Sequence, residues 1–190
     1  MMEKEGLSFD EMWGKVLICD RKYDGLFYTA VKTTKIYCRP SCRSRKPKKS
    51  NVEFYTTMAE AESNGFRACK RCQPETEFSP DEELTRKVMA YLTANYKESI
   101  TLPDIAGHVG MSPFYLERVF KQETSETPRS CLERIRVDKA AHLLKYTELS
   151  NLAICFEAGF QSPSNFYRIF RKLKGYSPTE FRKRSEAMSS

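Results

Sequence analysis

Four cysteines in two short pairs constrain the fold of this chain more than any other feature of its sequence. Cys38 and Cys42 are separated by three residues, Cys69 and Cys72 by two, and twenty-six residues lie between the pairs. Each pair can bind one metal ion from a tight turn, and two pairs complete a tetrahedron of ligands. Four thiolates at this spacing predict one Zn²⁺ per chain. The two pairs must therefore converge in the folded protein.

The residues around these cysteines are strongly basic. No acidic residue occurs between Asp24 and Glu53, and the chain as a whole has a net charge of +7. The bases beside the cysteines are Arg39, Arg43, Arg45, Lys46, Arg67, Lys70 and Arg71. Such an excess favours a polyanionic partner, with nucleic acid before a membrane. A membrane-spanning segment is not expected, because the sequence has no run of about 18 apolar residues.

Composition divides the chain into two domains. The polar segment 73–84 contains two prolines and indicates a linker, so we place the domains at 1–77 and 78–190. Before the linker, β-branched and aromatic residues at 27–34 and 51–55 predict strands, and 57–65 predicts a short helix. After it, apolar residues recur at helical spacing. The expected fold is a small α+β zinc-binding domain followed by an all-α region.

The helical half contains an internal repeat, in which residues 105–128 align with residues 154–178. Ser112, Pro113, Arg118, Phe120 and Pro128 recur fifty positions later as Ser162, Pro163, Arg168, Phe170 and Pro178. Each copy has a short apolar helix, a turn with a glycine, and a Ser-Pro pair that begins a second helix. This order predicts two helix–turn–helix motifs. One helix over 128–146 is expected to join them.

The second helix of each motif is expected to enter the major groove of DNA. Apolar residues such as Leu116 and Phe166 are interpreted as its inward, core-facing side. The candidate DNA contacts on the outward side are Phe114, Tyr115, Arg118, Lys121, Ser164, Asn165, Tyr167, Arg168 and Arg171. A joining helix of about 27 Å would separate the two motifs by roughly one duplex turn, so a monomer could cover the site.

The cysteine pattern by itself leaves two interpretations of the zinc open. The metal can stabilise a small domain that has too little core. Alternatively, four thiolates around Zn²⁺ carry a formal charge of −2 and can attack an electrophile, while the surrounding bases hold a polyanion. Spacing does not show which sulfur would react. Cys19, Cys131 and Cys155 lie outside the pattern, and we interpret them as packing residues.

Longer motifs connect the chain to a known family. The stretches TTKIYCRPSCRSR, NVEFY and GFRACKRCQP closely resemble the N-terminal domain of the bacterial Ada DNA-repair proteins over roughly residues 8–75. Residues 84–184 resemble the AraC-type DNA-binding region. Together they are similar to the AdaA-type branch, which repairs methylphosphotriesters. The alkylguanine-transfer motif Pro-Cys-His-Arg of full-length Ada proteins does not occur.

This resemblance implies an activity and a set of site residues. The activity is an irreversible, single-turnover transfer of a methyl group from a DNA methylphosphotriester to Cys38, after which the methylated protein activates transcription. The resemblance also implies backbone contacts from Thr34, Arg43, Arg45 and Arg67. It further implies RNA polymerase as a partner, a monomer, and a cytoplasmic, nucleoid-associated location in bacteria. The N-terminal segment is charged and has no apolar core, so we do not expect it to be a secretory signal.

Two other functions are compatible with the same residues. One is an AraC-type transcriptional regulator whose zinc site is structural or senses an oxidant or another electrophile. The other is an architectural DNA-binding protein without methyl chemistry. Transfer of a labelled methyl group to Cys38 distinguishes the first interpretation from both.

Overall fold

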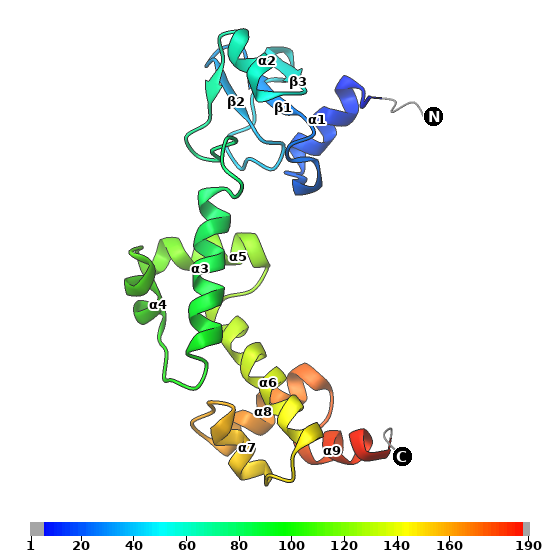
Figure 1. Ribbon diagram of the computed structural model, residues 1–190, viewed down its shortest axis with the longest axis vertical. Coiled ribbons are helices and arrows are strands. Elements are labelled where there is room, and N and C mark those ends of the chain that lie inside the picture. The colour runs from blue at the N-terminus through cyan, green and yellow to red at the C-terminus, as the bar shows by residue number, and fades with distance from the viewer. Residues whose placement is uncertain (1–5, 188–190) are drawn as a thin grey trace. The chain divides into compact units, whose positions relative to one another are not determined.

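The structure, a computed structural model, describes residues 6–187 of the chain. It divides into two compact units between Glu83 and Leu84 (Figure 1). The predicted linker is only partly irregular, because helix α3 (Pro80–Ala94) begins within it. Among the described residues, no helix is both long and apolar enough to cross a membrane.

The N-terminal unit is a small α+β fold built on a four-stranded sheet in the order β3-β1-β2-β4. Its elements are α1 (Phe9–Leu17), the 3-10 turn η1 (Arg21–Tyr23), β1 (Tyr28–Val31), β2 (Ile36–Cys38), η2 (Lys49–Asn51), β3 (Val52–Tyr55), α2 (Met58–Ser63) and β4 (Arg67–Ala68). The predicted strands 27–34 and 51–55 correspond to β1 and β3, and the predicted helix 57–65 to α2. Sequence patterns did not predict α1, β2 or β4.

The two faces of the sheet have different roles. Ala30 of β1 lies opposite Tyr37 of β2, and both pack in an apolar cluster with Ala61 of α2. Thr29 and Cys38 form the next pair in the same antiparallel register. Because side chains alternate along a strand, this second pair lies on the opposite face of the sheet. The sheet therefore carries a small core on one face and the first cysteine on the other.

Strand β4 brings the second cysteine pair to the first. It is parallel to β2, with Tyr37 opposite Ala68, and the Cys69 N–H donates to the Tyr37 carbonyl at 3.0 Å. Cys69 and Cys72 therefore follow β4 at the edge where β2 ends in Cys38. The buried guanidinium of Arg39 then fastens the segment after Cys72, because it donates to the Gln73 carbonyl at 3.0 Å.

The C-terminal unit is all-α, as predicted. After α3 come α4 (Leu102–Val109), α5 (Pro113–Thr124), α6 (Pro128–Tyr146), α7 (Asn151–Glu157), α8 (Pro163–Lys174) and α9 (Pro178–Ala187). The pairs α4–α5 and α7–α8 are the two helix–turn–helix copies, and α6 is the single joining helix expected over 128–146. Ser112 and Ser162 cap α5 and α8 by accepting N–H bonds from Tyr115 and Asn165.

Each copy has its own core, and α6 contributes to both. Cys131, Leu132 and Ile135 of α6 pack with α3, α4 and α5. Further along the same helix, Val137 and Leu144 pack with α7 and α8. The predicted inward residues are confirmed: Leu116, Val119, Phe120, Phe166, Ile169 and Phe170 are all buried.

The turn of the second copy also contacts the loop that precedes α4. The Arg136 side chain of α6 donates to the carbonyls of Tyr96 and Glu98, each at 2.7 Å. Gly159, at φ +86°, lies against the same loop: a Cβ there would be 2.8 Å from the Lys97 Cα and closer still to the Tyr96 carbonyl. Only a glycine fits this approach. Gly110, the equivalent residue of the first copy, has open space around it.

Candidate metal centre and nucleic-acid interface

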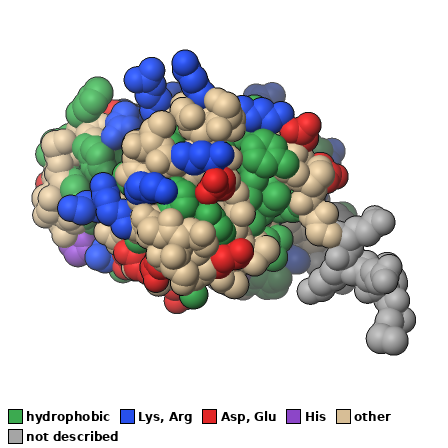
Figure 2. Space-filling model, turned by 90° about the horizontal axis from the view of Figure 1, so that it is seen from above, with side chains coloured by type: hydrophobic (Ala, Val, Ile, Leu, Met, Phe, Trp, Pro, Cys, Tyr) green, Lys and Arg blue, Asp and Glu red, His purple; other side chains and the backbone are tan. Residues whose placement is uncertain are grey.

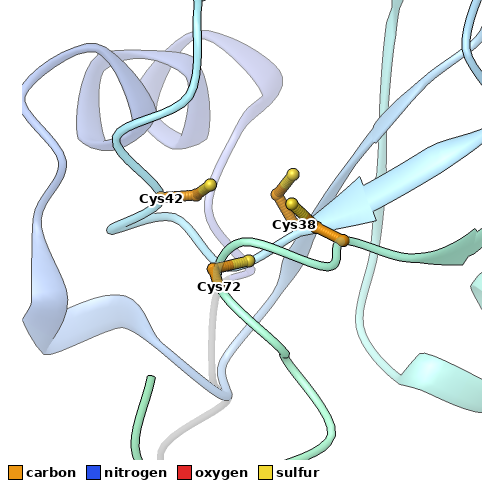
Figure 3. Close-up of side chains that lie close together, drawn as sticks. Cys38, Cys42 and Cys72 are labelled. Carbon is orange, nitrogen blue, oxygen red and sulfur yellow. The ribbon is translucent and has the colours of Figure 1, made fainter. Parts of the chain in front are cut away.

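The four predicted ligands form one cluster. The sulfurs of Cys38, Cys42, Cys69 and Cys72 all lie within 4.8 Å of one another, and all four residues are buried. Figure 3 shows the side chains of Cys38, Cys42 and Cys72 converging from the end of β2, the loop that follows it, and the segment after β4. A Zn–S bond of about 2.3 Å requires tetrahedral sulfurs roughly 3.8 Å apart. The cluster therefore fits one Zn²⁺ held by four thiolates.

The thiols of the cluster hold their protons unequally. Cys38 donates its proton toward Cys42, which raises the pKa of Cys38 and lowers the pKa of Cys42 to about 6. The pKa of Cys69 is lowered mainly by its contact with Cys38. Such crowding favours displacement of the protons by a divalent cation, which binds all four sulfurs as thiolates.

The sulfurs differ in their neighbours. The sulfur of Cys42 is hydrogen-bonded to the Ser44 hydroxyl at 3.3 Å, and the hydroxyl becomes the donor when Cys42 is a thiolate. Cys69 accepts from the backbone N–H of Cys72. The contacts of Cys38 and Cys72 are with the other sulfurs of the cluster, and the exposed fractions of Cys38 (9%) and Cys69 (8%) are nearly equal.

A small pocket opens beside Cys38. It has a volume of about 30 Å³, and its lining includes Cys38, Thr29, Arg45 and Lys46. The Lys46 ammonium donates to the Cys42 carbonyl at 2.9 Å and to the Cys19 sulfur at 3.2 Å, so it fastens the loop after Cys42. Arg45 is exposed at the pocket mouth. A guanidinium and a sulfur nucleophile thus border the same opening.

The predicted backbone contacts of this unit are all exposed. Thr34 lies in the turn between β1 and β2, and Arg67 begins β4. The two come near each other because the Arg67 N–H donates to the carbonyl of Lys35 at 2.9 Å. Arg43 and Arg45 lie on the loop after Cys42. Figure 2 shows several Lys and Arg side chains gathered on the face that it views, with acidic side chains mainly toward its edges.

Three residues of the site were not found, or were interpreted too simply, from sequence. In the sequence, Arg39 and Lys46 are two of the bases beside the cysteines. In the structure, Arg39 points inward to residues 73–77, and Lys46 contacts Cys19 and Cys42. Thr29, buried and opposite Cys38, carried no signal of its own. The alternation of side chains in a hairpin over 28–38 would have placed it beside Cys38, had β2 been recognised.

The predicted DNA-reading faces of the two copies match closely. Residues 111–120 and 161–170 show the same sequence of exposed, half-buried and buried positions. The half-buried positions are Tyr115 and Asn165, and the exposed candidates are Phe114, Arg118, Lys121, Ser164, Tyr167, Arg168 and Arg171. Some are already engaged: Arg168 donates to the Asn165 side chain at 2.7 Å. Both second helices therefore expose polar or aromatic faces of similar shape.

Of the three other cysteines, Cys131 and Cys155 are packing residues in the helical unit, and Cys19 lies in the metal unit. Cys131 and Cys155 are fully buried, and burial raises the pKa of both, to about 11 for Cys131. These thiols therefore stay neutral at physiological pH, as expected from the sequence. Cys19 is half-buried and contacts Lys46.

Comparisons with known proteins agree with the division of the chain into a metal unit and a helical unit. The family described as the metal binding domain of Ada matches residues 11–75, and a helix-turn-helix domain family matches residues 105–184. The DNA-binding domain of AdpA, solved in complex with a target DNA, is 27% identical with a TM-score of 0.53, over 55% of this chain and 94% of that one.

Two curated relatives match nearly the whole chain. The bifunctional transcriptional activator/DNA repair enzyme Ada of Escherichia coli is 37% identical over 96% of this chain, which spans about half (51%) of that protein. The bifunctional transcriptional activator/DNA repair enzyme AdaA of Bacillus subtilis is 35% identical over 93% of this chain and 84% of that protein. The four-cysteine cluster, the two helix–turn–helix copies and the extent of this match place the chain in the Ada family, in the form that joins an Ada metal-binding domain to an AraC-type region.

Proposed function

We propose that this protein repairs methylphosphotriesters in the DNA backbone by moving the methyl group irreversibly to Cys38. The observation that carries the proposal is the place of that sulfur's residue: Cys38 belongs to a zinc-type cluster and lines a small pocket that Arg45 also lines. The names of the Ada and AdaA relatives, which include DNA repair enzyme, support the same activity.

The transfer needs no general base. Zinc, when bound, keeps the four sulfurs deprotonated at neutral pH. The Cys38 sulfur forms a bond to the methyl carbon while the carbon–oxygen bond of the triester breaks, and the electron pair leaves with the phosphate oxygen. The leaving group is an ordinary phosphodiester, whose negative charge Arg45 at the pocket mouth can stabilise. The product is a thioether that no ligand of the site can cleave, so each molecule acts once.

The formal charge of the zinc–thiolate cluster favours the damaged phosphate over intact DNA, and it changes when the methyl group is transferred. A cluster of formal charge −2 repels the anionic diesters of intact DNA but tolerates a neutral triester. Methylation changes that charge to −1. At 5–8 Å from a phosphate and an effective dielectric near 20, the loss of one charge strengthens DNA binding by about 2–3 kcal/mol, or one to two orders of magnitude. We therefore propose that methylation converts the protein into a sequence-specific activator.

Double-stranded DNA is the proposed partner of both units. The proposed backbone contacts in the metal unit are Thr34, Arg43, Arg45 and Arg67. The α5 and α8 helices are proposed to read two successive segments of major groove, as a monomer, and the activated protein is proposed to recruit RNA polymerase. The AdpA domain, a relative of the helical unit solved with its DNA, supports the use of this fold for DNA binding.

The direct test uses duplex DNA carrying radiolabelled methylphosphotriesters. We expect one label per protein molecule, recovered on the peptide that contains Cys38, and none on Cys38→Ser. Cys19→Ser is the matched control, because it removes a nearby thiol that is not a ligand and should leave labelling intact. Labelling of Cys42, Cys69 or Cys72 instead, or full labelling of Cys38→Ser, contradicts the assignment.

The transcriptional step has a separate readout. DNA binding should be measured for the unmodified and the labelled protein on random promoter fragments, and we expect tighter, sequence-selective binding only after labelling. Equal affinity and equal selectivity before and after labelling would contradict the switch.

The burial of all four sulfurs favours one alternative, a regulator whose zinc site is structural or senses another electrophile or an oxidant. This alternative expects no label from the triester DNA. It also expects that Cys38→Ser responds to alkylating stress as the wild type does, if the remaining ligands retain the metal.

A further inference from the structure

The Thr29 hydroxyl is a buried polar group without a hydrogen-bond partner. The residue is only 3% exposed, and within residues 6–187 its oxygen has no donor or acceptor in reach. Buried polar groups are nearly always satisfied, so an exception of this kind indicates a partner that acts in another state of the site. Thr29 also lines the small pocket beside Cys38.

The cross-strand partner of Thr29 is Cys38. Thr29 and Cys38 are opposite one another in the antiparallel pair β1–β2, so their side chains lie on the same face of the sheet. The Cβ atoms of such a pair are about 4.5–5.5 Å apart, and a threonine hydroxyl can take any of three staggered positions about χ1. A rotation of Thr29 about χ1 can therefore turn its hydroxyl toward the Cys38 side chain.

The two groups are chemically complementary. Thr29 has an O–H without an acceptor, and the hydrogen-bond partners of the Cys38 sulfur are the three other sulfurs of the cluster. A thiolate is a stronger acceptor than a thiol or a thioether, because it carries a full negative charge. The neighbouring ligand already shows such a contact, since the Ser44 hydroxyl is 3.3 Å from the Cys42 sulfur.

We propose that Thr29 is a positioning residue for Cys38: its hydroxyl donates a hydrogen bond to the metal-held thiolate, fixes the direction of the remaining lone pairs and moderates their reactivity. This inference deepens the proposed function and rests on Cys38 being the acceptor. The bond is made to the charged ground state and is weakened as the sulfur forms its bond to carbon, so it raises the barrier. It is lost in the thioether product, which is a poor acceptor.

The test measures reactivity toward a small donor that needs no DNA. Zinc-loaded protein is treated with iodomethane; the Cys38 sulfur–carbon bond forms, the carbon–iodine bond breaks, iodide leaves and no proton moves. We expect Thr29→Val to react about three- to tenfold faster at Cys38, because a hydrogen bond to a charged group is removed without a change of side-chain shape. Thr29→Ser, which keeps the hydroxyl, should retain the wild-type rate.

A spectrum provides a readout that a loss of packing would not imitate. In Co²⁺-loaded protein, the sulfur-to-metal charge-transfer band of Thr29→Val should shift to lower energy, since the thiolate has lost a donor, and Thr29→Ser should resemble the wild type. Thr33→Val is the matched control: it makes the same chemical change at an exposed position of the turn after β1 and should change neither rate nor spectrum.

The outcomes separate this inference from the proposed function. Faster reaction and a shifted band for Thr29→Val alone support the hydrogen bond, even if triester DNA transfers no label. Equal rates and spectra for the wild type, Thr29→Val and Thr29→Ser overturn it, even if the DNA assay succeeds. Equal changes in the Val and Ser variants, or alkylation that avoids Cys38 in every variant, also overturn it.

Discussion

The two units of this protein have small apolar cores and are stabilised in different ways. The metal unit has a compact aromatic and aliphatic cluster on one face of its sheet, and the cysteine cluster lies on the edge of the other face. The helical unit instead has two apolar cores that share α6. The comparison suggests that the metal is part of the structure of the first unit, whereas burial of apolar surface suffices for the second.

Removal of zinc should have the largest effect, because it should unfold one unit and not the other. Structural zinc sites contribute about 10–16 kcal/mol to small domains at neutral pH, more than a sheet of this size can replace. We expect a chelator, or Cys72→Ala, to unfold the metal unit and leave the helical unit folded. Hydrogen exchange read separately for residues 6–83 and 84–187 would measure this, with Cys155→Ala as a thiol control. Simultaneous loss of protection in both units would contradict it.

Truncation of buried side chains in the helical unit should destabilise that unit and leave the metal unit intact. Phe120→Ala and Phe170→Ala each remove a buried ring from one helix–turn–helix core and should cost about 3–5 kcal/mol of helical-unit stability. Zinc content should not change, because neither ring belongs to the metal unit. Urea denaturation followed by far-UV circular dichroism, together with a zinc assay, would test both statements. Zinc loss in these variants would show that the units are not independent.

The two turn glycines compare the helix–turn–helix copies with each other. Both have positive φ, so an alanine should cost about 1–2 kcal/mol at either position. Only Gly159→Ala also clashes with the backbone of Tyr96 and Lys97, which should add about 1–3 kcal/mol. Thermal unfolding of both variants measures the difference. Equal destabilisation would show that the 95–99 loop moves away freely.

Helix caps should give the smallest and most similar effects. Ser112→Ala and Ser162→Ala each remove the hydroxyl that caps α5 or α8, at a cost of about 1 kcal/mol. Because the two hydroxyls accept equivalent N–H bonds, at 3.3 Å in α5 and 3.4 Å in α8, the two variants should agree within error in chemical denaturation, and Ser112→Asn should retain stability. A clear difference between the copies would show that the repeat is less symmetric in energy than in structure.

Much of the metal site could be predicted because its signals are local. Two pairs of cysteines identify their ligand role by spacing, and the Ser-Pro starts and apolar spacing of the helical half identify both helix–turn–helix copies. The strands β2 and β4 escaped prediction because they are only three and two residues long, too short for a periodic pattern. They are nevertheless the strands that bring Cys38 and Cys69 together.

The sequence by itself determined which sulfurs meet, which helices repeat and which side chains fill the two helical cores, because each depends on spacing along the chain. The tertiary structure decided that Cys38 and Arg45 line the same pocket, which bases face inward, and that Thr29 lies opposite Cys38. It also decided that Gly159, unlike Gly110, contacts a distant loop. These features depend on contacts between segments far apart in sequence, which no local pattern encodes.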